Sequence, residues 1–191
     1  MQGPTILPLY DQSNVSGRAT RTSGMYYATV AADGGSVAGG AVSVGLIAYA
    51  PIWLPGSCDK IVIEVTSAGG ASTVGRTAIY SVDQVTGRPG SKLAQCATDH
   101  AVDSLGVKEV NITLSATAGW YYAAFVTDAA SLSVKLHLGG VAGMPAAESA
   151  AQSMSTARPA YFETKSGLTL PTTAAVINVS GSSPRIALRA A

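Results

Sequence analysis

Residues 107–114 have the sequence VKEVNITL, and this stretch decides the fold class. From Lys108 onward, apolar and polar residues alternate. One face collects Val110, Ile112 and Leu114, and the opposite face collects Glu109, Asn111 and Thr113. Successive side chains of a strand point to opposite sides of the sheet. The alternation therefore predicts an antiparallel strand with one face in a core and the other in water.

Similar short segments surround this strand and are separated by turn residues. Strands are expected at 25–30, 41–49, 52–54, 60–65, 78–82, 92–96, 120–126, 131–138, 161–165 and 174–179. Residues 184–189 alternate between apolar and basic side chains and are expected to close a sheet. A helical composition occurs at 145–155, where a loop is the alternative. This series of short strands separated by turns predicts an all-β fold, an antiparallel two-sheet β-sandwich with jelly-roll-like wiring.

The chain of 191 residues fits one domain with an additional arm. Residues 1–24 are polar and irregular and contain several prolines and glycines, so we expect an extended N-terminal arm there. Residues 25–191 are expected to form the sandwich. A terminal arm is either frayed or attached to a neighbour, and we hypothesise that this arm clasps another subunit.

Charge and hydropathy exclude several classes of partner. The net charge is +1, which predicts no nucleic-acid binding and no attraction to anionic lipid. The longest apolar stretch, 41–54, is interrupted by Gly45 and Pro51 and is too short to span a bilayer, so no membrane insertion is expected. Residues 1–4 lack the basic and apolar regions of a secretory signal. Only 12% of residues are charged, which predicts a surface covered in an assembly.

The sequence contains few residues in patterns typical of a catalytic site. His100 falls in a polar loop and His137 on the outward face of a strand, and both are predicted to lie on the surface. Ligand spacings typical of zinc or calcium sites are missing, and the loop aspartates are interpreted as turn formers. We expect no catalytic residue, cofactor or metal. The competing hypothesis, a glycan-cleaving enzyme, requires a carboxylate pair facing a groove, and no such pair is visible in the sequence.

The chain has two cysteines, Cys58 and Cys96. They allow one disulfide, but spacing alone cannot establish it. The alternative, which we favour, is a pair of buried free thiols in a chain that folds in a reducing cytoplasm.

Aromatic residues supply the candidate binding surface. Trp120, Tyr121 and Tyr122 are consecutive, so a strand places Tyr121 on one face and Trp120 and Tyr122 on the other. Together with Tyr80 they form a candidate surface for sugars or a partner protein. The competing interpretation, which we favour, places these aromatics in the core and at a contact between sheets.

Several motifs follow one another between residues 59 and 126. They are Ala78-Ile79-Tyr80-Ser81, Gly87-Arg88-Pro89-Gly90, Leu93-Ala94, Gly106-Val107-Lys108-Glu109-Val110 and Gly119-Trp120-Tyr121. In this order they resemble a β-sandwich module of bacteriophage virion proteins, common in tail fibres and related appendages. The ending at 184–189 is also similar. Pro89 fixes φ and Gly90 is free to take a positive φ, which predicts a type II turn.

The resemblance implies a non-enzymatic virion structural protein on the particle surface, assembled in the host bacterial cytoplasm. Its expected role is that of a tail-fibre or receptor-binding component that attaches to host surface glycans. The expected partners are other virion proteins and two further copies of the chain in a homotrimer. The alternative is a capsid decoration or cement protein (a head fibre) that stabilises the head. Fibre proteins usually carry such a module after a long shaft, but this sequence contains no heptads and no collagen-like repeat that would form one. The sequence therefore does not decide between the two hypotheses.

Overall fold

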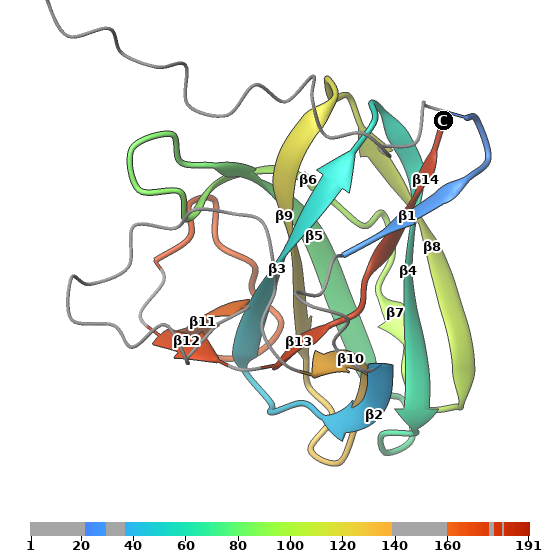
Figure 1. The fold of residues 1–191 in the computed structure, drawn as a ribbon. Helices are drawn as coiled ribbons and strands as arrows, with labels where there is room; N and C mark the ends of the chain where they lie inside the picture. The colour runs from blue at the N-terminus through green and yellow to red at the C-terminus, as the bar shows by residue number, and fades with distance from the viewer. Residues whose placement is uncertain (1–21, 30–36, 139–159, 176–177, 181) are drawn as a thin grey trace, which may run out of the picture.

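The computed structural model describes residues 22–29, 37–138, 160–175, 178–180 and 182–191. Every regular element in these ranges is a β-strand, and the strands form two antiparallel sheets, so the predicted two-sheet sandwich is confirmed (Figure 1). The jelly-roll wiring stays a prediction. The described residues contain no helix long and apolar enough to cross a membrane. Residues 1–21 of the predicted arm and the segment 145–155 lie outside the described residues.

The first sheet, sheet A, has seven strands. Its main order is β1 (Tyr26–Ala28), β14 (Ala187–Ala190), β4 (Cys58–Ser67), β10 (Ser133–Leu138) and β13 (Ser182–Pro184). In addition, β2 (Val37–Ala41) pairs with β10, and β8 (Gly106–Leu114) pairs with β4. The closing strand predicted at 184–189 corresponds to β14, which is inserted between β1 and β4.

The second sheet, sheet B, also has seven strands. Its main order is β12 (Asn178–Ser180), β11 (Ala160–Thr164), β3 (Leu46–Leu54), β9 (Gly119–Thr127), β5 (Val74–Val82) and β6 (Pro89–Gln95). The short strand β7 (His100–Ala101) pairs with β5. Of the strand predicted at 174–179, Asn178 and Val179 belong to β12, whereas the Ala174 N–H donates to the Gly90 carbonyl of β6.

The space between the sheets is filled by the inward faces of both. Sheet A contributes Ile61, Ile63, Val65, Ile112 and Leu114, and sheet B contributes Ile52, Ile79, Ala123 and Phe125. In β8, Glu109, Asn111 and Thr113 are exposed while Ile112 and Leu114 are buried, so the predicted alternation is confirmed. Cys58 and Cys96 are buried free thiols in this core, as the favoured interpretation holds.

Sheet B carries a second hydrophobic cluster on its other face. The cluster comprises Ile47, Tyr49, Ala78, Tyr80, Tyr122, Ala124, Val126, Tyr161 and Leu170. Strands β3 and β9 are nearly continuous apolar runs, so they require cover on both faces. Residues 165–175, which we call the strap, provide part of that cover. The Lys165 N–H donates to Gly45 near β3, and the Thr172 carbonyl accepts from the Lys92 N–H of β6 at 2.7 Å.

Candidate functional site

Strand β9 separates the three consecutive aromatics in the way the sequence predicts. Tyr121 packs against the core between the sheets, and its hydroxyl donates to the Thr117 carbonyl at 2.9 Å. Tyr122 points to the opposite face and joins the second cluster. Tyr121 therefore lies on the opposite face of sheet B from the other candidate residues.

Tyr80 and Tyr122 do not contribute to an exposed surface. Their exposed fractions are 0% and 1%. The Tyr80 hydroxyl donates to the Pro171 carbonyl of the strap, and the Tyr122 hydroxyl donates to the Gly87 carbonyl, each at 2.7 Å. Burial raises the pKa of both phenols, which remain neutral donors. These two residues belong to the core, as the favoured interpretation holds, because the apolar face of sheet B requires cover.

Trp120 remains partly exposed and has an aromatic partner on the neighbouring strand. The register of β3 and β9 places Trp53 directly opposite Trp120. Their ring centroids lie 5.8 Å apart with an interplanar angle of 75°, an edge-to-face arrangement. Both indoles are partly exposed. We call Trp53 and Trp120 the tryptophan pair. The pairing was missed in the sequence because it depends on the register between two strands that are distant along the chain.

A tightly bonded turn, residues 83–88, contacts Tyr122, whose hydroxyl donates to the Gly87 carbonyl. One oxygen of Asp83 accepts the N–H groups of Val85 at 2.9 Å and Thr86 at 2.8 Å, and these bonds hold the pKa of the Asp83 carboxyl below its usual value. Val85 at the tip is 91% exposed. The expected type II turn with a positive φ at Gly90 is wrong. The residue with positive φ is Gly87, at 69°, because the chain reverses earlier and Gly90 already belongs to β6.

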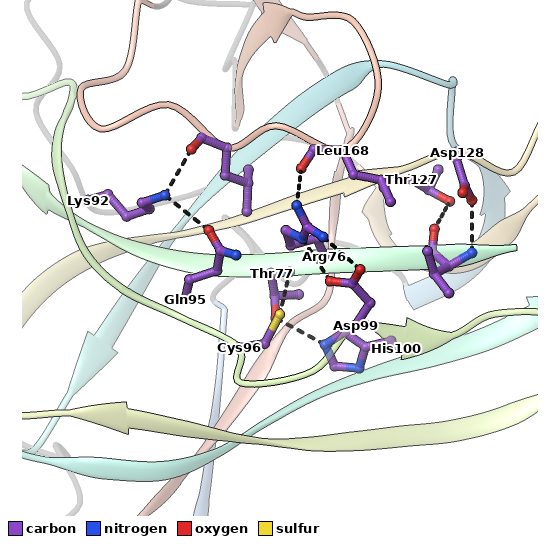
Figure 2. A network of polar contacts seen from close by, with 12 residues as sticks. Arg76, Thr77, Lys92, Gln95, Cys96, Asp99, His100, Thr127, Asp128 and Leu168 are labelled. Atoms are coloured by element: carbon purple, nitrogen blue, oxygen red, sulfur yellow. Dashed lines mark hydrogen bonds and ion pairs between the residues drawn. The ribbon is translucent and has the colours of Figure 1, made fainter.

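A polar network fastens the strap to β5 and β6 (Figure 2). The guanidinium of Arg76 donates twice to the Asp99 carboxylate, both bonds being 2.7 Å, and once to the Leu168 carbonyl at 3.1 Å. The Lys92 ammonium donates to the Leu170 carbonyl at 2.9 Å. These charged groups are engaged in holding backbone segments together.

His100 is buried, with an exposed fraction of 0%, so the predicted surface position is wrong. The reason is that residues 100–101 pair with β5 and draw the imidazole between the two sheets. The ring lies 3.0 Å from the Thr77 hydroxyl and 3.2 Å from the Lys108 carbonyl. Burial lowers its pKa from 6.5 to about 4. His100 is therefore a neutral side chain near pH 7. The side chain of His137 lies outside what the structure describes.

Among the described residues, Glu163 is the one carboxylate that is buried, and its exposed fraction is 1%. It accepts the Tyr49 hydroxyl and the Ala175 N–H, both at 2.9 Å, and the Lys165 ammonium lies 2.9 Å away. Burial by itself raises the pKa of this carboxyl, but the three donors outweigh burial, and the pKa lies below its usual value. Among the described residues, no group of three or more His, Cys, Asp or Glu side chains is arranged to hold a metal ion.

No family model matches the chain, and neither the curated proteins nor the solved structures contain a match. The resemblance of residues 59–126 to phage virion modules stays a prediction, and the tryptophan pair is the candidate functional site.

Proposed function

We propose that the chain is a non-enzymatic virion structural protein that contributes to attachment of the particle to glycans of the bacterial surface. The observation that carries this proposal is the partly exposed tryptophan pair, Trp53 and Trp120, held by the register of two neighbouring strands. The motif order at residues 59–126 supports the assignment to a virion. Arg76, His100 and Glu163, groups suited to catalysis, are engaged in structural bonds instead.

The tryptophan pair suits a sugar for physical reasons. Indole rings present rigid apolar faces with a polar N–H, and the C–H faces of a pyranose pack well against such surfaces. Seven paired positions between β3 and β9 hold the backbone of the two tryptophans opposite each other before a ligand binds, which reduces the entropy lost on binding. A net charge of +1 is compatible with a neutral ligand. A single shallow site binds weakly, and the proposed homotrimer would raise the strength of attachment through avidity.

The test is a binding measurement with immobilised bacterial envelope polysaccharides and with intact bacteria. We expect Trp120→Ala to weaken binding at least about tenfold, a loss of the size that hot-spot aromatics produce. Val107→Ala is the matched control, because Val107 is 68% exposed but lies on sheet A. Thermal unfolding of both variants establishes that they fold. Binding by Trp120→Ala that equals the wild type would contradict the adhesion site.

A capsid decoration role is the second candidate. It is favoured by the way the start of the described chain is fixed to sheet A. The Gly24 N–H donates to the Ala190 carbonyl at 2.9 Å, and β1 then pairs with β14. A pull on residues before Thr22 would be transmitted directly to the sheet. Gold-labelled antibodies on intact particles separate the two roles, since label at the tail tip supports attachment and label over the head supports decoration.

A further inference from the structure

One short segment closes the gap between the edges of the two sheets. We call residues 96–101 the bridging segment. On the sheet B side, the Cys96 N–H donates to the Thr77 carbonyl at 3.0 Å, and β7 pairs with β5. On the sheet A side, the Ala97 N–H donates to the Asn111 carbonyl of β8 at 2.8 Å. The segment therefore occupies part of the β8 edge that another strand would otherwise pair with.

The side chain of His100 is the central contact of this bridge. Its Nε2 lies 3.0 Å from the Thr77 hydroxyl of β5, as Figure 2 shows. Its Nδ1 lies 3.2 Å from the Lys108 carbonyl of β8. A carbonyl oxygen only accepts, so Nδ1 carries the proton and donates. Nε2 then accepts the hydroxyl proton of Thr77. The neutral imidazole thus joins the two sheets with both nitrogens satisfied.

The charged groups on the neighbouring elements offer a protonated ring little compensation. Asp99 precedes His100, but both of its oxygens accept from Arg76 of β5. The Lys108 ammonium of β8 donates to Ser104, and Asp103 in the same loop is exposed. The thiol of Cys96 lies beside Thr77, because its sulfur accepts the Thr77 N–H at 3.4 Å. A second proton on the buried ring would therefore face no carboxylate in hydrogen-bonding contact among the described residues, and Thr77 would have to turn its hydroxyl to accept.

We propose that His100 is an acid-sensitive latch that holds the bridging segment across the two sheets. When Nε2 takes up a second proton, the buried cation has only neutral acceptors beside it, and the segment opens to bring the ring into water. Release frees the Lys108 and Asn111 carbonyls at the β8 edge. Leu105 and Val107, which are 66% and 68% exposed, already lie at the start of that strand. The opened edge has the unpaired backbone and apolar side chains that allow pairing with a further strand.

The direction of the pH effect follows from linkage. A group whose pKa is lower in the closed state than in the open state stabilises closure above the open-state value, and this stability is lost as the pH falls. With values of 6.5 for an open and about 4 for the closed imidazole, the open population rises about 30-fold between pH 7.5 and pH 5.0.

Hydrogen–deuterium exchange of the full chain at these two pH values tests the latch, with rates corrected for the intrinsic effect of pH. We expect protection of residues 96–111 to fall about 30-fold at pH 5.0, while β3 (Leu46–Leu54) keeps its protection. His100→Gln retains a donor and an acceptor but does not titrate, so its protection should not change with pH. Equal pH dependence in this variant, or an equal loss over all strands, would overturn the proposal.

A second measurement does not depend on the variant folding. NMR titration of the wild-type imidazoles, with His137→Gln to assign the signals, should show His100 titrating well below 6.5, and the Ala97 amide should shift with it. Titration of His100 near 6.5, or an Ala97 amide that does not respond, would also overturn the latch.

Discussion

The outer faces of the two sheets differ in their exposure to solvent. Sheet A leaves its outer face to solvent and lines it with partly exposed ion pairs. These are Asp59–Arg189 at 2.6 Å, Lys60–Glu109 at 3.5 Å and Glu64–Lys135 at 3.9 Å. Sheet B buries its outer face under the strap and the turn at 83–88. There the contacts are tyrosine hydroxyls and a buried glutamate bonded to backbone groups.

The difference originates in the residue pattern of the central strands. In β4, residues alternate, so one face is apolar and the other accepts charges at little cost. In β3 and β9, neighbouring residues are apolar on both sides, and leaving either face in water would forfeit the free energy of burial. Stability of this molecule should therefore depend on the cover of sheet B far more than on the ion pairs of sheet A.

The largest expected effect is at Tyr80 under the strap. Tyr80→Ala removes a fully buried ring that packs edge-to-face on Tyr49 at 5.1 Å, and we expect a loss of about 3–5 kcal/mol in the free energy of unfolding. Asn111→Ala, on the exposed face of sheet A, should change it by no more than about 0.5 kcal/mol. Urea unfolding measures both. Equal losses would contradict the contrast between the two faces.

Glu163 gives an effect of intermediate size that depends on pH. The pKa of its carboxyl is lower in the folded state than the ordinary 4.5, so its contribution is present above pH 4.5 and is lost as the pH falls through the folded value. We expect Glu163→Gln to cost about 1–2 kcal/mol at pH 7 and less at pH 3.5. Glu64→Gln on sheet A is the comparison. A cost at Glu163 that stays constant with pH would show that its charge is not what matters.

The smallest effects come from a matched pair of lysines. Lys92→Met removes the bond to the strap carbonyl of Leu170, and we expect a loss of about 1 kcal/mol. Lys135→Met removes the pair with Glu64, for which we expect less than about 0.5 kcal/mol. Thermal unfolding at low and high salt compares the stability losses of the two variants. A larger loss for Lys135→Met than for Lys92→Met would mean that the ion pairs of sheet A stabilise the molecule more than the cover of sheet B.

The alternating strands were predictable because the pattern that defines them lies within a few consecutive residues. Residues 107–114 show which side chains of β8 face the core, and Tyr121 and Tyr122 divide between faces as the period of two requires. The pairing of Trp53 with Trp120 was not predictable, because it depends on non-local register. The strap left only a faint signal, Leu168 and Leu170 within a polar stretch. The burial of His100 had no signal in the sequence, because it depends on the pairing of residues 100–101 with β5.

The position of β14 has a consequence for the order of synthesis. Strand β1 pairs with β14 within the described residues, and β14 presents the fully buried Leu188 to the core. The first described strand leaves the ribosome early, but the strand it pairs with emerges last of those described. Strands β3 to β9 can therefore associate while translation continues, whereas this part of sheet A has to wait until residues 187–190 are free. A pause in translation before that point would leave the edge of β4 open to other chains in the cell.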